Sequence, residues 1–309
     1  MIGRITMKIL ICDKTEKEAI DQMKAAGLQV DVRDDITPEE LPKVLPAYDG
    51  MVVRSRTKVR QPLIDVCPNL KVIVRGGVGL DTIDAEYARS KGITVMNTPM
   101  ASSASVAELT IAYMFALARS VFQASLSMKS EKWEKKLFEG DEIGGKTLGL
   151  IGIGNIGKEV AKRAKALGMT VIAYDPNVKS VEDVRMVTLD ELLTNSDYIS
   201  LHLPKTKDSA NMIGKAQIAK MKTGVRIINC ARGGIIDEAA LYEGLTNGKI
   251  AGAALDVYAD EPPSNWNLAK LPNVIGSPHI GAATKEAQGR VGAEVAQKLI
   301  GFAGNLQPV

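Results

Sequence analysis

A glycine turn between an apolar run and a helical pattern is the feature that most constrains this chain. The run from Leu148 to Ile153 leads into Gly152-x-Gly154-x-x-Gly157. Gly152 permits a tight strand-to-helix turn, Gly154 lets the backbone approach a pyrophosphate closely, and Gly157 lets the helix pack on the strand. The unpaired N–H groups at the start of that helix favour phosphate, so the segment predicts a dinucleotide site.

An acid ends the next apolar run. Asp175 lies 18 residues past Gly157, where a carboxylate can accept hydrogen bonds from both hydroxyls of an adenosine ribose. A 2′-phosphate would face like charge there, so we expect NAD rather than NADP as the cofactor. A glycine turn alone also occurs in α/β domains that bind no ligand, but the strand, helix and acid together favour the dinucleotide.

Composition indicates a globular α/β protein. The 309 residues suffice for two domains, and the 45% hydrophobic content with only 4% aromatic residues suits parallel sheets. The net charge of +3 is spread along the chain, so we expect no nucleic-acid partner. No stretch reaches membrane-spanning length and charges follow the first apolar run at once, so we expect no membrane partner and no signal peptide. Three cysteines without disulfide or metal spacing favour a reducing, cytoplasmic location and predict no metal site.

Apolar runs alternate with amphipathic helical patterns in both halves of the chain, which predicts two doubly wound parallel sheets. The runs read as strands are 8–12, 28–32, 50–53, 70–74 and 93–97, then 148–153, the run ending at 175, 197–203, 225–229, 251–257 and 273–277.

Two further helical patterns bear on domain organisation. Residues 102–119 predict one long helix that bridges two domains, with an ordinary core helix as the alternative. The Lys- and Glu-rich segment 128–140 has helical spacing and reads as a solvated face. Residues 284–302 could return to the first domain. We therefore expect a flavodoxin-like substrate domain, 1–98 plus 286–309, and a Rossmann NAD-binding domain, 99–285, with a cleft between them.

Polar segments follow three predicted strands of the second domain, where ligands of parallel sheets bind. They contain Arg232, Glu261 and His279. An arginine can hold a carboxylate and polarise a carbonyl, a histidine can take an alcohol proton, and a carboxylate can orient the imidazole. That set suits hydride transfer at a hydroxy acid. Each residue also has an ordinary structural interpretation, and residue chemistry alone does not decide between His279 and His202, the two histidines of the chain.

Four segments in order, LGLIGIGNIG, NCARGGIIDE, ALDVYADEPP and SPHIGAAT, resemble the D-isomer-specific 2-hydroxyacid dehydrogenases over almost the whole chain. The resemblance implies that Arg232 binds the substrate carboxylate and carbonyl, Glu261 pairs with the imidazole, and His279 is the acid/base. His202 then has a structural or cofactor-neighbouring role. The implied cofactor contacts are Val78, Gly152, Gly154, Asn155, Ile156, Gly157, Asp175, Leu203, Pro204, Cys230, Ala231, Arg232, Asp256, His279, Gly281 and Ala282.

Within the family the first domain resembles the members that oxidise 3-phosphoglycerate to 3-phosphooxypyruvate in serine biosynthesis. The resemblance implies that Arg54 and Ser55 contact a phosphate, and that backbone N–H groups of the glycine loop hold a carboxylate. The implied substrate contacts are Arg54, Ser55, Arg75, Gly76, Gly77, Arg232 and His279. The alternative is that the basic residues at 54–58 are solvated loop residues.

Two departures from the family pattern stand out. Asn155 occupies a position where many relatives carry arginine, and no C-terminal regulatory domain follows residue 309, so we expect no serine feedback through such a domain. The region around the long helix resembles the dimer-forming region of the family, which implies a homodimer, or a tetramer built from it. The alternatives in function are another 2-hydroxyacid dehydrogenase, such as a glyoxylate or hydroxypyruvate reductase, and a non-catalytic NAD(H)-sensing protein on the same fold.

Overall fold

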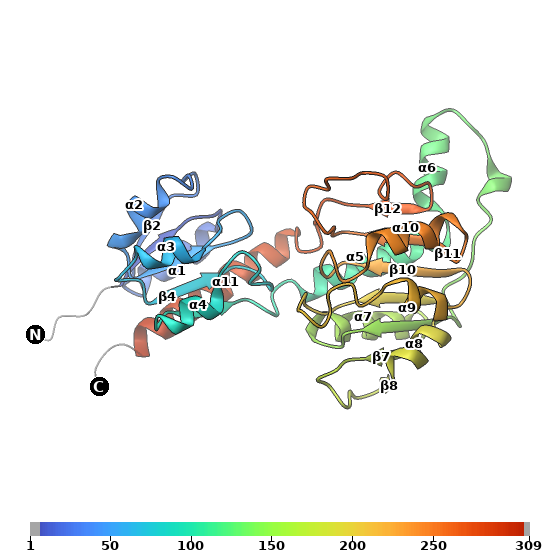
Figure 1. Cartoon of the computed structure of the whole chain (residues 1–309). Coiled ribbons are helices and arrows are strands. Elements are labelled where there is room, and N and C mark those ends of the chain that lie inside the picture. Colours follow the sequence, from blue (N-terminus) through green and yellow to red (C-terminus); the bar gives the residue numbers. More distant parts are fainter. Residues whose placement is uncertain (1–6, 306–309) are drawn as a thin grey trace, which may run out of the picture. The chain divides into compact units, whose positions relative to one another are not determined.

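A computed structural model describes residues 7–305, which divide into two compact units (Figure 1). Unit 1 is Met1–Ser102 with Ala283–Val309, and unit 2 is Ser103–Ala282. The outermost ends expected for the first domain, 1–6 and 306–309, lie outside the described residues. Each unit is built on one parallel sheet, so the prediction of two parallel-sheet α/β domains is confirmed.

The sheet of unit 1 has the strand order β2-β1-β3-β4-β5, and every pair is parallel. The chain leaves β1 toward β2 on one side and returns to β3 on the other, so the loops after β1 and β3 flank a topological switch point. The strands are β1 (Lys8–Ile11), β2 (Gln29–Val32), β3 (Gly50–Val53), β4 (Val72–Arg75) and β5 (Thr94–Asn97).

Helices cover both faces of this sheet because successive strand residues point to opposite sides. Ile9 and Ile11 pack in one cluster with α1 (Lys17–Ala25) and α11 (Lys285–Asn305). Leu10 packs in the other cluster, under the short helices. Those helices are α2 (Leu41–Val44), the 3₁₀ turn η1 (Leu45–Ala47), α3 (Gln61–Asp65) and α4 (Ala85–Ser90).

The sheet of unit 2 has the order β12-β11-β10-β9-β6-β7-β8, again with parallel pairs throughout. Its switch point lies between β6 and β9, beside the glycine turn that follows β6. The strands are β6 (Thr147–Ile151), β7 (Thr170–Tyr174), β8 (Arg185–Met186), β9 (Tyr198–Leu201), β10 (Val225–Asn229), β11 (Ile250–Leu255) and β12 (Val274–Gly276). The two-residue strand β8 was not predicted, because so short a pairing leaves no apolar run in the sequence.

One face of this sheet is covered by α5 (Ser103–Ala118) and α7 (Asn155–Ala166), which pack on each other. The opposite face is covered by α8 (Leu189–Asn195), α9 (Lys215–Lys220) and α10 (Glu238–Thr246). Because α5 lies wholly within unit 2, it is a core helix of that unit and not a bridge.

A segment that we call the arm, residues 121–141, projects from unit 2 after Ser120 breaks the helical path with a φ of 47° (Figure 1). It consists of α6 (Val121–Lys129), an extended stretch and the 3₁₀ turn η2 (Lys135–Leu137). The expected Lys- and Glu-rich face is exposed, but it forms no α-helix beyond Lys129. Within residues 7–305 no single helix could cross a membrane by length and hydropathy; α5 and α6 meet that test only together, across a 67° bend.

Candidate active site

The glycine turn after β6 has the geometry that a dinucleotide needs. Gly152 has a φ of 97°, and a Cβ there would lie 2.5 Å from the carbonyl oxygen of His202. A Cβ on Gly157 would lie 2.4 Å from the carbonyl oxygen of Gly152, so α7 can approach the turn after β6 only because residue 157 is glycine. At Gly154, by contrast, a Cβ would meet no atom within 4 Å. This open space lies where α7 begins, and the N-cap residue is Gly154 itself, which has no side chain to cap the helix.

Asp175 lies at the end of β7 and is tied to the same turn. Its carboxylate accepts hydrogen bonds from the backbone N–H groups of Ile153, at 3.0 Å, and Asn177, at 2.9 Å. The acid is half-buried, so it is fixed in place and still reachable. The close-packed Gly152 and Gly157, the open Gly154 and the anchored acid therefore fit the pyrophosphate and ribose of NAD.

Arg232 is positioned by the turn that follows β10. The buried Asn229 side chain accepts a hydrogen bond from Ala231 N–H at 3.0 Å and donates one to the Arg232 carbonyl at 2.9 Å. Arg232 Nη1 donates to the Ala231 carbonyl at 2.7 Å. The role of Asn229 in holding the turn was not predicted from the sequence. The signal in the sequence is an asparagine directly at the end of a strand, where its amide can bond to the backbone of the next residues.

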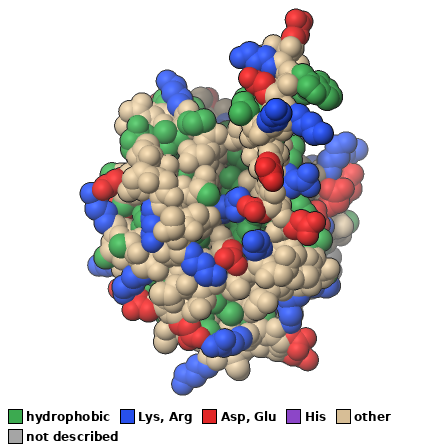
Figure 2. Space-filling model, turned by 90° about the vertical axis from the view of Figure 1, so that its right-hand side faces the viewer, with side chains coloured by type: hydrophobic (Ala, Val, Ile, Leu, Met, Phe, Trp, Pro, Cys, Tyr) green, Lys and Arg blue, Asp and Glu red, His purple; other side chains and the backbone are tan. Residues whose placement is uncertain are grey.

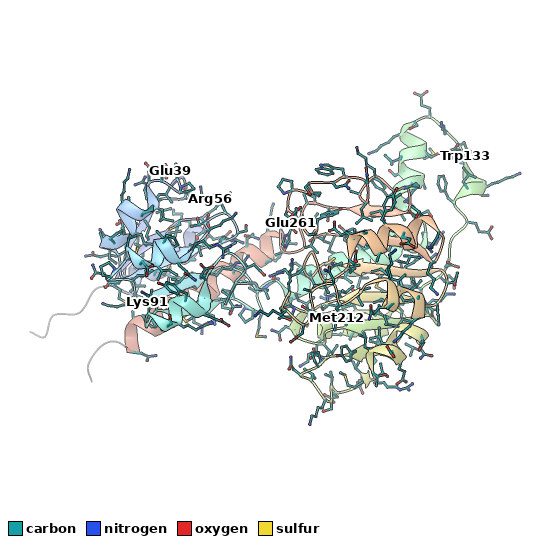
Figure 3. The ribbon with its side chains drawn as sticks, viewed as in Figure 1. Glu39, Arg56, Lys91, Trp133, Met212 and Glu261 are labelled. Atoms are coloured by element: carbon teal, nitrogen blue, oxygen red, sulfur yellow. The ribbon has the colours of Figure 1, made fainter. Side chains whose placement is uncertain are left out.

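Gly233 brings this turn against the loop after β11. A Cβ on Gly233 would lie 1.7 Å from the carbonyl oxygen of Tyr258, so only glycine permits the contact. The start of α10 holds the same loop, since Glu238 accepts a hydrogen bond from Ala259 N–H at 2.7 Å. The turn with Arg232 and the loop with Glu261, labelled in Figure 3, are thereby held side by side.

His279 and Glu261 form an ion-pair contact between the loops after β12 and β11. The distance from His279 Nδ1 to Glu261 Oε2 is 2.7 Å, and both side chains are partly exposed. Burial alone would raise the pKa of Glu261, but the hydrogen bond and charge of His279, Tyr258 N–H and the charge of Arg232 outweigh burial and lower it. An ionised Glu261 accepts a hydrogen bond from the Nδ1–H group of His279, which leaves Nε2 of the same ring for proton exchange.

The backbone of His279 is held in an uncommon conformation by Asp256. His279 has a φ of 53°, and its N–H donates to the Asp256 carbonyl at 2.9 Å. The buried Asp256 carboxylate accepts hydrogen bonds from Ile280 N–H at 2.8 Å and Gly281 N–H at 2.7 Å. Ser277 Oγ also donates to Asp256 and contacts the hydroxyl of Tyr113. The contact of Asp256 with the cofactor stays a prediction; in the structure its carboxylate shapes the histidine turn.

His202, the other histidine, has a different setting. Its Nε2 lies 2.8 Å from Ser200 Oγ, and its buried Nδ1 has no hydrogen-bond partner in the described part of the chain. Burial lowers the pKa of His202 to about 3, so the ring is neutral near pH 7. The geometry thus favours His279 as the acid/base.

Cys230 and the other two cysteines are buried free thiols. Burial raises the pKa of Cys230 to about 12, so it is not a thiolate near neutral pH. Within residues 7–305 no group of His, Cys, Asp and Glu side chains could hold a metal ion.

The predicted substrate residues of unit 1 gather at the glycine loop after β4. A Cβ on Gly77, whose φ is 143°, would lie 1.7 Å from Arg75 Nη1, so the guanidinium lies against that glycine. The stem of Arg54 also contacts the loop, with its Cγ 3.5 Å from the Cβ position of Gly76. Two arginine side chains therefore lie against one loop.

The loop's own amides partly have intramolecular partners, and the substrate contacts of Gly76 and Gly77 stay predictions. Gly76 N–H donates to the Val53 carbonyl at 2.9 Å, and Gly77 N–H donates to Thr98 Oγ1 at 2.7 Å. These two groups are thus not available to a carboxylate in this conformation, which leaves Val78 and Gly79 as the candidate donors. Val78 accepts a hydrogen bond from Asn97 through its carbonyl, at 2.5 Å.

Several residues predicted to contact the cofactor are located in the fold near the ends of strands or the start of α7. Asn155 and Ile156 begin α7, Leu203 and Pro204 follow β9, and Ala282 ends unit 2. Their contacts with the cofactor stay predictions, as does the contact of Ser55 with the substrate.

Comparison with known proteins adds independent information. The family model described as "D-isomer specific 2-hydroxyacid dehydrogenase, NAD binding domain" matches residues 111–281, which lie within unit 2. A D-3-phosphoglycerate dehydrogenase of Archaeoglobus fulgidus is 50% identical over 305 residues, and the match covers 97% of this chain but 58% of that relative. The chain thus spans less than two thirds of that relative's length.

Two further relatives match along nearly their whole length. A hydroxypyruvate reductase of Thermotoga maritima is 50% identical over 297 residues, which cover 94% of this chain and 97% of the relative. The crystal structure of a D-lactate dehydrogenase from Aquifex aeolicus, complexed with NAD and lactic acid, has a TM-score of 0.85 at 31% identity and covers 96% of each chain.

Proposed function

Since the chain belongs to the D-isomer-specific 2-hydroxyacid dehydrogenases and carries their NAD-binding domain, we propose that it oxidises 3-phosphoglycerate to 3-phosphooxypyruvate. The observation that carries the reaction type is the contact between His279 and Glu261 beside the turn that holds Arg232. The glycine turn and Asp175 would hold NAD, which would supply the acceptor for the hydride at C2 of the substrate.

The chain's own residues supply the remaining steps of the proposed reaction. Arg232 holds the carboxylate and polarises the oxygen at C2. His279 takes the alcohol proton through Nε2 as the carbonyl forms, and Glu261 stabilises the imidazolium that results. In the reverse direction His279 returns that proton.

Support for a phosphorylated substrate comes from unit 1 and from the relatives. Arg54 and Arg75 lie against the 76–77 loop, and a dianionic phosphate suits two guanidinium groups. Relatives named D-3-phosphoglycerate dehydrogenase are 50% and 49% identical to this chain. The place of the reaction in serine biosynthesis, and a cytoplasmic location, follow only if this substrate assignment holds.

A second candidate is hydroxypyruvate reduction, because the Thermotoga relative with that name is equally similar. A substrate panel read at 340 nm separates the two: 3-phosphoglycerate and D-glycerate with NAD, hydroxypyruvate and glyoxylate with NADH. We expect 3-phosphoglycerate to give the highest kcat/KM of the oxidations, and Arg54→Gln to lower it by about 10- to 100-fold. A wild-type enzyme that reduces hydroxypyruvate well and does not discriminate for phosphate would overturn the substrate assignment.

The non-catalytic alternative is decided by the same assay. A protein that only senses NAD(H) would bind NADH, as seen by fluorescence, and turn over none of the four substrates. Turnover of any of them, lost in His279→Asn, supports an enzyme.

A further inference from the structure

Asp13 is a buried acid at the switch point of unit 1 that neither the family motifs nor the proposed reaction use. It follows β1, it is 3% exposed, and the loop after the neighbouring strand β3 folds around it. That loop, residues 54–57, contains the arginine proposed to hold the phosphate. Ligands of open parallel sheets bind outside the carboxyl ends of strands at such a point.

The Asp13 carboxylate accepts four hydrogen bonds from three residues of the 54–57 loop. Oδ2 accepts from the backbone N–H groups of Arg54 and Thr57, the latter at 3.3 Å. Oδ1 accepts from Thr57 Oγ1 at 3.0 Å and from Arg56 Nε at 2.9 Å. The acid therefore fixes both the backbone path of the loop and the direction of one side chain.

This arrangement divides the two arginines. Arg56, labelled in Figure 3, is turned toward Asp13 and also donates to the Cys12 carbonyl. The Arg54 side chain donates a long, 3.5 Å hydrogen bond to the Lys14 carbonyl, and its stem lies over Gly76. One guanidinium thus neutralises the buried acid, and the stem of the other arginine lies against the glycine loop that Arg75 also contacts.

We propose that Asp13 is a positioning residue for the substrate's anionic end: it accepts hydrogen bonds from the backbone N–H groups of Arg54 and Thr57, and so places Arg54 as the arginine that binds the phosphate, while Arg56 neutralises its charge. The inference rests on the proposed function and deepens it. Asp13 acts through the loop and does not itself touch the substrate.

The test compares Asp13→Asn with Asp49→Asn. Asp49 is a matched control, because it also accepts a backbone hydrogen bond in the same sheet, from Lys8 N–H at 2.9 Å, and pairs with Lys71, but it precedes β3 instead of following a strand. In Asp13→Asn the amide NH₂ group would face hydrogen-bond donors of the 54–57 loop and could not accept from them. The loop would therefore lose the backbone path that the carboxylate fixes. We expect KM for 3-phosphoglycerate to rise by about 10- to 100-fold, with kcat/KM for D-glycerate changed by less than about 3-fold.

Further readouts separate positioning from mere stability. We expect Asp49→Asn to lower the Tm without changing the ratio of kcat/KM for the two substrates, and Asp13→Asn to leave the Kd of NADH unchanged. Arg56→Gln should preserve the ratio within about 3-fold, because its guanidinium serves Asp13 and not the ligand. The proposal is wrong if Asp13→Asn lowers both kcat/KM values by the same factor. It is also wrong if Asp13→Asn, like Asp49→Asn, lowers the Tm without changing the ratio of the two kcat/KM values.

If Asp13→Asn does not fold, Thr57→Val is the variant to use, because it removes only the hydrogen bond from the Thr57 hydroxyl to Asp13. We expect KM for 3-phosphoglycerate to rise by about 3-fold or more in Thr57→Val, and an unchanged KM would refute the proposal. If the wild-type enzyme prefers hydroxypyruvate, the substrate assignment fails by itself. The role of Asp13 is then judged by KM for hydroxypyruvate, against the same Asp49→Asn control.

Discussion

His279 combines a reactive side chain with a backbone conformation that few non-glycine residues adopt. Its φ of 53° is maintained by bonds from its own turn to Asp256, both to the carbonyl and to the carboxylate. Such conformations persist only where the surroundings fix them, and they concentrate at functional sites. The carboxylate of Glu261 then fixes the ring from the side.

Replacement of His279 by asparagine tests the acid/base role. Asparagine tolerates the left-handed backbone but cannot exchange a proton, so we expect kcat to fall by about 10²- to 10⁴-fold. The Kd of NADH, measured by fluorescence titration, should change little. Near-normal turnover in His279→Asn would remove the role assigned to this residue.

His202 gives the protein a predictable response to acid. Its pKa is lowered to about 3 from an ordinary value of 6.5, so between these values the unfolded chain takes up a proton that the folded chain excludes. The free energy of unfolding should therefore fall as the pH drops from 6.5 toward 3. Between pH 6.5 and 5 this contribution is about 2 kcal/mol.

Urea denaturation of the wild type and His202→Gln at pH 7.5 and 5.0 measures the effect. The variant should lose less stability than the wild type over this interval, because glutamine does not titrate. Equal losses in both proteins would show that His202 is not the titrating group.

At the scale of elements, the glycine turn and α7 were predictable from sequence because both obey local rules. Gly152 and Gly157 indicate places where the backbone has a close neighbour. The apolar runs on both sides of the turn indicate strands that are buried on both faces. The contacts made by Asp13 and Asp256 could not be predicted, since each joins loops from strands that are neighbours only in the folded sheet. The helical spacing of 128–140 did not predict its backbone correctly, because α6 ends at Lys129 and the charged residues beyond it are mostly exposed, so burial against a core does not hold a helix there.

Two alanine substitutions in the turn should have different consequences. Gly157→Ala places a methyl against the Gly152 carbonyl, so we expect a loss of stability of about 1–3 kcal/mol together with weaker NADH binding. Gly154→Ala meets no protein atom, so it should weaken NADH binding and leave the Tm nearly unchanged.

Calorimetry and NADH titration check both variants. Gly289→Ala in α11 is the control, because that glycine is exposed and its Cβ would meet no atom within 4 Å. It should raise the Tm slightly and leave NADH binding unchanged. Unaltered NADH affinity in Gly154→Ala would contradict the placement of the pyrophosphate.

At the scale of the whole molecule, the arm is the surface best suited to a second copy of the chain. Its large apolar side chains are exposed among charged ones, and Figure 2 shows hydrophobic groups between Lys and Arg on this projecting segment. Such residues are usually covered in an assembly. They are Val121 (53% exposed), Phe122 (50%), Leu126 (47%), Met128 (56%), Trp133 (79%, labelled in Figure 3) and Leu137 (70%).

We therefore expect a homodimer that depends on the arm. Light scattering should give twice the chain mass of 33.1 kDa for the wild type and a lower mass for the double variant Phe122→Glu, Leu126→Glu. Val66→Asn is the control, since this exposed side chain lies on unit 1. A wild-type protein that is monomeric at working concentration would refute the dimer.

The helix α11 packs on α1 and β4 although nearly two hundred residues of chain precede it after β5. During synthesis the apolar faces of α1 and β4 therefore leave the ribosome long before the helix that covers them. The residues between β5 and α11 take roughly 10 to 40 s to synthesise, and unit 2, whose residues are contiguous, can complete its sheet in that time. The incomplete unit 1 meanwhile exposes the hydrophobic surface that α11 will cover. The nascent polypeptide should accordingly engage holding chaperones until its last helix emerges.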